Sequence, residues 1–263
     1  MGPSCCSGMR LRSRITIEDV RVSRLTLRFP SAGLESGYRS NSLQRVLRNF
    51  ALFNLAIFGA AVFHNAGRSF EESAYQSALH FQIGNYNAAA TGLLGISGLL
   101  AALAARAQMR WHLVSPLAVE VSIVILSLWQ MAWCIVTEDW YLAKMLGHAD
   151  PRQALQKTDF SDTWLVLVID TSITVMHFVV AIRWVVLWPI TILGAVLYPV
   201  SCFILGSPEA APETLQLTLF ALVIVSALGK RAVEVTERRA FVQLLRERTL
   251  RAETEFRMNR LAA

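Results

Sequence analysis

Apolar residues along the chain gather in six blocks that short polar segments separate. The blocks cover about 48–65, 87–105, 114–136, 163–182, 184–205 and 214–228. Each is close to the roughly 20 residues that an α-helix needs to cross about 30 Å of hydrocarbon. The pattern therefore predicts an all-α, polytopic membrane protein whose membrane domain, residues 48–228, contains six transmembrane helices. A five-span arrangement, with the first or last block lying in the interface, is the alternative.

The two ends of the chain are polar, and they differ from each other. Residues 1–47 are rich in Ser, Gly and Arg, which predicts a basic, largely disordered cytoplasmic arm, with an edge strand or a short helix within it as the alternative. Residues 229–263 instead predict one long amphipathic cytoplasmic helix that continues from the last span. Its apolar residues recur at three- and four-residue steps and are Phe241, Leu244, Leu245, Ala252 and Phe256. Arg248 interrupts this apolar stripe. The helix is coiled-coil-like, so residues 229–260 could pair two copies of the chain.

The charges between the blocks alternate in sign. The second and fourth connections carry only basic residues, among them Arg106 and Arg183, whereas the fifth carries Glu209 and Glu213 without a base. Cytoplasmic loops are enriched in Lys and Arg, so this alternation predicts both termini in the cytoplasm. Arg183 itself is expected to snorkel toward the inner interface. The sequence does not identify which membrane holds the protein.

Composition supports a membrane protein whose tails contact lipid. Hydrophobic residues make up 54% of the 263 residues and charged residues only 17%, and the net charge of +6 arises almost wholly in the tails. Because these basic tails flank predicted membrane spans, the positive charge favours anionic lipid headgroups over nucleic acid as the partner. Residues 1–48 contain no apolar signal-peptide segment, so the first span is expected to serve as the targeting signal.

Three ionisable residues fall inside predicted spans, where charge is costly and often functional. Glu120 and His177 are predicted at a similar depth in antiparallel spans, and Asp170 precedes His177 by two helical turns with Thr174 between them. A Glu120–His177 pair with Asp170 deeper would form a polar seam. Because His titrates near neutral pH, the seam could sense protons or ions. The alternative is a structural clamp between helices.

Small residues in the second block predict close helix packing. Ser97, Gly98, Ala101 and Ala102 stand in small-xxx-small steps that let two helix backbones approach. The partner helix could belong to the same bundle or to a second copy.

Few residues point to chemistry. Cys5 and Cys6 in the arm are candidates for palmitoylation. The chain has no CxxC pair, no GxSxG and no HExxH, so we expect no catalytic residue, no metal site and no cofactor. An enzyme acting alone is the function that the sequence favours least.

The segment Glu234-Val-Thr-Glu-Arg238-Arg-Ala-Phe241 follows the sixth block on the predicted helix. A charged helix with E-x-x-x-R-x-x-F that leaves a six-span cassette resembles the membrane region of class III adenylate and guanylate cyclases. The resemblance covers the layout of residues 48–260, and its motif covers eight residues. It implies a signalling helix in which Glu234, Arg238, Phe241 and Leu245 transmit conformation. The cyclase catalytic domain would begin where this chain ends, so no catalytic residue is carried over.

Three functions follow from these patterns. The first is a multi-pass membrane anchor and sensor that couples its bundle to the C-terminal helix. The second is a small ion or proton channel or transporter that uses the polar seam. The third is a structural membrane protein without catalytic activity.

Overall fold

The computed structural model describes residues 26–29, 31–71, 78–111, 114–155, 160–180 and 182–262. Cys5 and Cys6, the candidates for palmitoylation, lie outside these residues. Over the described residues the protein is all-helical, and no strand occurs there. The predicted fold class is therefore confirmed at the level of an all-α protein with a long C-terminal helix.

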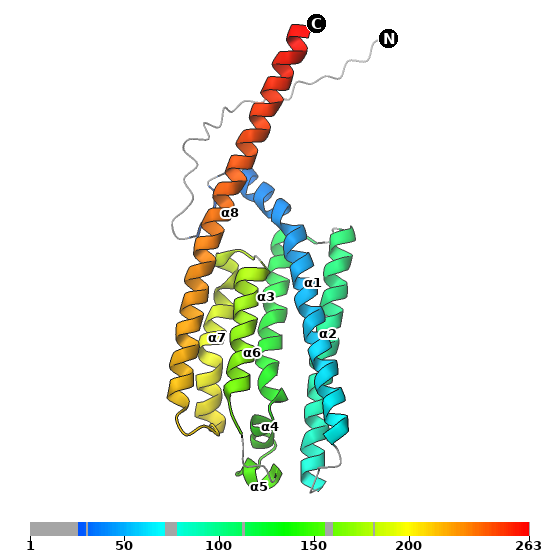
Figure 1. Ribbon diagram of the computed structural model, residues 1–263, viewed down its shortest axis with the longest axis vertical. Helices are drawn as coiled ribbons and strands as arrows, with labels where there is room; N and C mark the ends of the chain where they lie inside the picture. The colour runs from blue at the N-terminus through cyan, green and yellow to red at the C-terminus, as the bar shows by residue number, and fades with distance from the viewer. Residues whose placement is uncertain are drawn as a thin grey trace.

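Six helices run roughly side by side, and α8 projects beyond the end of the bundle at which α1 begins (Figure 1). These are α1 (Ala32–Glu71), α2 (Ala78–Trp111), α3 (Pro116–Trp133), α6 (Thr163–Thr174), α7 (Trp184–Leu205) and α8 (Pro212–Ala262). A π-helical turn (Val175–Val179) extends α6, and a 3-10 turn (Cys134–Thr137) extends α3. The short helices α4 (Asp139–Met145) and α5 (Pro151–Leu155) cover the opposite end of the bundle.

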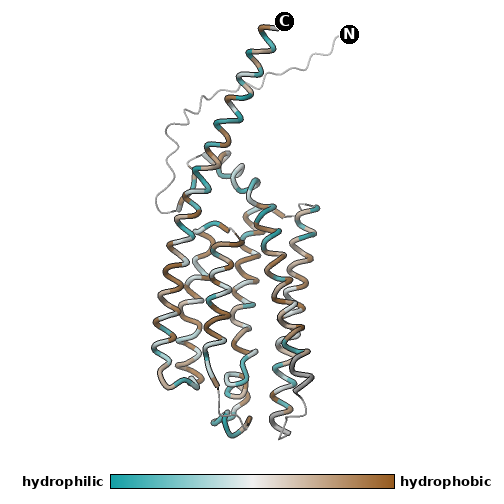
Figure 2. Tube along the Cα trace, viewed as in Figure 1, coloured by the Kyte–Doolittle hydropathy of each residue, from teal (hydrophilic) through white to brown (hydrophobic). Residues whose placement is uncertain are grey.

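Four stretches of helix are long and apolar enough to cross a membrane. They are Ala32–Ala66, Phe81–Trp111, Pro116–Thr137 and Trp184–Leu205. Thr163–Val179 is apolar but shorter. Figure 2 shows apolar residues concentrated in the bundle and polar residues along the projecting part of α8. Several helices of this length and composition indicate an integral membrane protein.

Helix α1 begins well before the first predicted span. The backbone N–H of Glu35 donates to the Ser31 carbonyl at 3.1 Å, which starts the helix inside the segment expected to be disordered. Leu43, Val46 and Leu47 are buried in the core, so one face of this polar segment packs against the rest of the protein. The prediction of a disordered arm is therefore wrong for residues 32–47. Polar composition misled it, because helical packing needs only one apolar face.

Helices α1 and α2 form a tight hairpin (Figure 1). A Cβ added at Gly98 would lie 2.8 Å from the Asn54 carbonyl oxygen, and Ala101 and Ala102 are buried. Ser97 donates its hydroxyl hydrogen bond to the Leu94 carbonyl of its own helix. The small residues of α2 thus let two helices of the same chain pack closely.

Helix α8 continues without interruption from the bundle into the projecting segment (Figure 1). It has no Gly or Pro after Gly229, so nothing in the sequence breaks it. From residue 246 to residue 261 its side chains are exposed. No other described residue therefore covers these side chains of the projecting part.

Candidate functional site: a buried charge cluster

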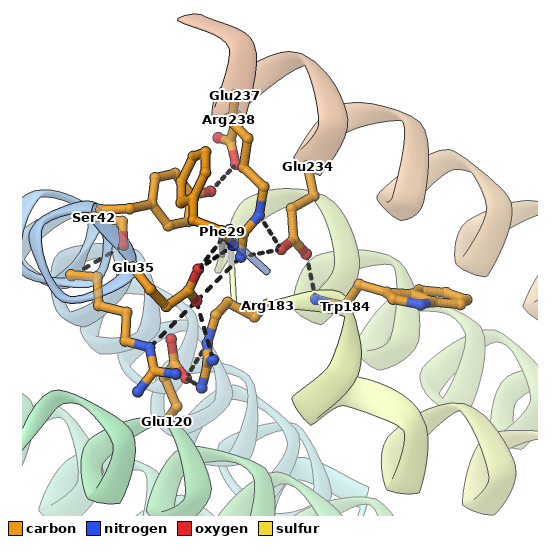
Figure 3. Close-up of polar contacts among 11 residues, drawn as sticks. Phe29, Glu35, Ser42, Glu120, Arg183, Trp184, Glu234, Glu237 and Arg238 are labelled. Atoms are coloured by element: carbon orange, nitrogen blue, oxygen red, sulfur yellow. Dashed lines mark hydrogen bonds and ion pairs between the residues drawn. The ribbon is translucent and has the colours of Figure 1, made fainter. Parts of the chain in front are cut away.

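Charged side chains from four parts of the fold meet at the end of the bundle where α8 leaves it (Figure 3). We refer to Glu35, Glu120, Arg183, Glu234 and Arg238 as the charge cluster. They come from α1, α3, the link before α7, and α8. All are buried, with exposed fractions of 6% or less. Buried charges are stable in proteins only when they are paired and hydrogen-bonded.

Arg183 joins α3 to α1. Its Nε donates to Glu120 Oε2 at 2.7 Å, and Nη2 donates to the same oxygen. Its Nη1 reaches Glu35 Oε1 at 3.4 Å. The guanidinium presents several donors in one plane, so a single arginine can bind two carboxylates. The sequence had predicted that Arg183 snorkels to the interface. That prediction is wrong, because Arg183 is buried and paired with two carboxylates.

Arg238 makes the matching connection from α8. Its Nη1 lies 2.8 Å from Glu35 Oε2, and its Nε donates to Glu234 Oε1 at 2.9 Å, one turn away on the same helix. Glu234 Oε2 in turn accepts the backbone N–H of Trp184, the first residue of α7. A carboxylate at a helix N-terminus satisfies an unpaired N–H and complements the helix dipole. Helix α8 is thus tied to both α1 and α7.

Aromatic rings enclose the Arg238 guanidinium. Its central carbon lies 4.5 Å from the centroid of Tyr38 and 5.0 Å from that of Phe29. Phe241 packs against both rings, with centroids 5.5 Å from Tyr38 and 6.1 Å from Phe29. These contacts exclude water, and cation–π attraction adds to the ion pairs.

The charge on Arg238 is held firmly. Burial alone would lower the pKa of its guanidinium, but hydrogen bonds and ion pairs with Glu35 and Glu234 outweigh burial and raise it. Lys230, also buried on α8, interacts electrostatically with Glu120 and Glu234. Three carboxylates thus face three basic groups, Arg183, Lys230 and Arg238. A balanced buried set is sensitive, because removing one member leaves an uncompensated charge.

The predicted polar seam does not form as expected. Glu120 pairs with Arg183, and His177 bonds elsewhere: its Nδ1 lies 2.7 Å from the Ile173 carbonyl and its Nε2 3.1 Å from Thr191 Oγ1 of α7. The predicted Glu120–His177 pair is therefore wrong. The physical reason is the π-helical turn that contains His177, because its wider turn shifts the face on which a side chain lies.

Asp170 and Thr174 are half-buried on α6, and in the sequence they lie between Glu120 and His177. Asp170 Oδ1 is buried and has no hydrogen-bond partner among the described residues. No hydrogen bond between described side chains joins Asp170 or Thr174 to Glu120 or His177. The four seam residues accordingly belong to three separate environments.

The residues of the predicted signalling helix lie at the charge cluster. Glu234 and Arg238 are members of it, Phe241 covers it, and Leu245 packs against the same aromatic group. Two members of the charge cluster, Glu35 and Arg183, were not predicted as site residues from the sequence. Glu35 lay in the segment assigned to disorder, and Arg183 was assigned to the interface. The signal available for Arg183 was its isolation, since it is the only charge between two apolar blocks.

The cluster contains no arrangement typical of metal binding. In the part of the chain that the structure describes, no three His, Cys, Asp or Glu side chains are placed to hold a metal ion. No protein-family model, curated protein sequence or solved structure matches the chain. Functional interpretation therefore depends on the geometry of the chain itself.

Proposed function

We propose that this protein is a multi-pass membrane module that couples the state of its helix bundle to the cytoplasmic segment of α8. The observation that carries the proposal is the charge cluster, in which Glu35 joins Arg183 of the bundle to Arg238 of α8. A coupling element needs two discrete arrangements with different partners. A set of shared ion pairs supplies them, because a change at one carboxylate redistributes the arginines among the others.

The resemblance to the membrane region of class III cyclases supports this proposal. The residues that carry the resemblance, Glu234, Arg238 and Phe241, all contact other helices or their flanking segments. In that family the helix leaving the membrane transmits conformation. We infer the same role for α8 here, without catalytic activity in this chain.

We further propose that the chain crosses the membrane six times, with both termini in the cytoplasm. The short helix Thr163–Val179 and residues 214–228 of α8 would add the fifth and sixth crossings to the four long apolar helices. The charges support this topology, since the connections at the end of the bundle from which α8 projects are basic (Figure 1). The basic tails would then face anionic lipid headgroups.

Thiol labelling tests the topology. With the four native cysteines replaced by serine, Leu261→Cys and Ala210→Cys in sealed, oriented vesicles should react with a membrane-impermeant maleimide from opposite sides. Both positions are exposed; Leu261 lies at the end of α8 and Ala210 just before its start. Labelling of both positions from the same side would show that the chain does not cross the membrane an odd number of times between them.

Hydrogen–deuterium exchange tests the coupling. Glu120→Gln changes α3, where Glu120 accepts hydrogen bonds from Arg183. No hydrogen bond between described residues joins Glu120 to α8, and its interaction with that helix is the electrostatic one with Lys230, which lies before the segment to be measured. We expect Arg183 to draw closer to Glu35 and weaken the Glu35–Arg238 pair, so that amides 234–245 exchange about tenfold faster in lipid nanodiscs.

Glu213→Gln is the matched control, because it makes the same charge change on an exposed residue of α8 itself. It should leave exchange at 234–245 unchanged. If Glu120→Gln also leaves it unchanged, the cluster does not transmit, and the third possibility, a structural membrane protein, is favoured.

One observation favours a second candidate, a proton or cation path. Asp170 Oδ1 is buried in an apolar helix without a hydrogen-bond partner among the described residues, and such carboxyls often mark ion pathways. This candidate predicts flux in liposomes that Asp170→Asn abolishes. Equal, background flux in both proteins would exclude it.

A homodimer through residues 229–260 is the partner we propose for the projecting helix. Leu250 and Phe256 are exposed there, at 53% and 67%. Leu250→Cys should form a disulfide-linked dimer under mild oxidation, whereas Arg251→Cys on the neighbouring face should do so far less. Equal cross-linking at both positions would indicate random collision.

A further inference from the structure

A cavity of about 920 Å³ lies between the α1–α2 hairpin and helices α3 and α6. This volume falls in the range of pockets that enclose one small molecule. Much of its wall is apolar, and the apolar side chains include Phe53, Ala60, Leu94, Met131 and Val168. The cavity is separate from the charge cluster, since none of the five cluster residues lines it.

The cavity is reached from the side of the bundle. Three of its apolar lining residues are also exposed on the surface: Phe63 at 81%, Trp164 at 62% and Leu167 at 52%. Phe63 belongs to a stretch of α1 that is apolar enough to span a membrane. In a bilayer these side chains would face acyl chains, so the natural entrant is a lipid rather than a water-borne solute.

One part of the wall is polar and incompletely hydrogen-bonded. The Ser127 hydroxyl donates to the thioether of Met176 at 3.4 Å, and sulfur is a weak acceptor. Gln130, one turn later on α3, donates from Nε2 to Asn54 Oδ1 at 2.7 Å. Its Oε1 is buried without a hydrogen-bond partner among the described residues. Leaving a buried amide oxygen unpaired costs free energy. A ligand hydroxyl that hydrogen-bonds to Gln130 and Ser127 would therefore be stabilised there.

The charges of the wall restrict the ligand further. Among the described residues, the lining includes two acids, Glu138 and Asp139, and one histidine, His64, but no lysine or arginine. A carboxylate or phosphate group would therefore meet two carboxylates and a single imidazole, without the lysine or arginine that usually binds such anions, and this disfavours anionic lipids.

We propose that this cavity binds an uncharged lipid that carries a free hydroxyl group on a single apolar body. The apolar body lies among the α1 and α6 side chains. The hydroxyl donates to Gln130 Oε1 and accepts from Ser127, after the side-chain adjustment that commonly accompanies binding. A sterol and a monoacylglycerol share this chemistry. The inference does not depend on coupling through α8.

Photolabelling of the full chain in nanodiscs tests the site. Two probes are used in parallel, a diazirine-bearing sterol with a free hydroxyl and a diazirine-bearing monoacylglycerol. We expect at least one to label the protein saturably, with adducts on α1 or α6, and the one that saturates identifies the source. Labelling that never saturates with either probe overturns the proposal.

Two variants of α1 provide a matched comparison. Ala60 lines the cavity, whereas Val62 does not line it and is exposed, so Ala60→Phe fills the mouth and Val62→Phe adds an aromatic ring outside it. Ala60→Phe should reduce saturable labelling at least fivefold, and Val62→Phe should leave it within twofold of wild type. Equal labelling of the two variants would place the probe on the outer surface and refute the cavity site.

The hydroxyl contact has its own readout. In wild type, the competing lipid with every hydroxyl methylated should displace the probe about tenfold less effectively than the alcohol, because it cannot donate to Gln130. Gln130→Leu should make alcohol and ether equivalent. If the two compete equally in wild type, the assignment of the hydroxyl to Gln130 and Ser127 is wrong.

Discussion

Arg238 Nη1 lies 2.8 Å from Glu35 Oε2, although the two residues are 203 positions apart in the chain. Glu35 is on the first turn of α1, and Arg238 is on α8 where that helix leaves the bundle. The pair therefore fixes the exit of the C-terminal helix to the start of the membrane domain. Through Arg183 the same carboxylate is also tied to α3.

Loss of the Glu35 charge should be strongly destabilising. Glu35→Gln leaves Arg183 and Arg238 without a shared anion, and breaking a buried ion pair typically costs about 3–5 kcal/mol. The measurement is the free energy of unfolding from SDS titration in mixed micelles. Glu237→Gln is the control: its carboxylate is 27% exposed and pairs with Arg45, which is 60% exposed, so about 1 kcal/mol or less is expected. Equal losses would show that burial of the cluster is unimportant.

Glu120 and Arg183 should be energetically coupled. Each single change, Glu120→Gln or Arg183→Gln, takes away the closest ion-pair partner of a buried charge, so the double variant should be more stable than the sum of the two losses indicates. Contacting charged pairs give interaction energies of about 0.5–3 kcal/mol in double-mutant cycles. The same SDS titration measures it. Strict additivity would mean that the 2.7 Å contact contributes nothing to stability.

Gly98 should be intolerant of a methyl group. In Gly98→Ala the new Cβ would meet the Asn54 carbonyl oxygen at 2.8 Å, so the α1–α2 hairpin must separate. Overpacking of this kind costs about 1–3 kcal/mol. Gly92→Ala is the matched control on the same helix, because its nearest neighbour is a side-chain atom at 3.7 Å. Thermal unfolding of both variants in detergent should separate them; similar midpoints would argue against close hairpin packing.

Stability should depend on pH through Asp162, at the end of the bundle opposite the charge cluster. Burial raises the pKa of this carboxyl above its ordinary value of 3.8, although Tyr198 and Ser207 donate hydrogen bonds to it. The folded state then holds the proton more tightly than the unfolded state does. The contribution of Asp162 to stability is full below pH 3.8 and is lost as pH rises from there through the raised pKa.

Asp162→Asn should remove that loss, giving a flatter dependence of the unfolding midpoint on pH from about 4 upward. Asp150→Asn, at an exposed carboxyl of the same connection, should keep the wild-type slope. A wild-type slope in Asp162→Asn would assign the pH dependence to another group.

The helices of this protein follow largely from its sequence. Long apolar blocks without charge can satisfy their backbone groups in lipid only as helices, which is why the fifth block matches α7 at both ends. The absence of Gly and Pro after Gly229 likewise predicted a long final helix, and α8 runs to Ala262. Glu234 and Arg238 were recognisable because a four-residue spacing places them on one helical face.

The partners of the charged residues were decided by the tertiary structure. Spacing along one helix could not show that Glu120 meets Arg183 rather than His177, because a π-helical turn changes the face of α6 at the critical residue. Nor could composition show that residues 32–47 fold, since their stability comes from packing one face against distant segments. Local patterns determine helices through backbone hydrogen bonding, whereas ion-pair partners depend on how separate helices are rotated and packed against one another.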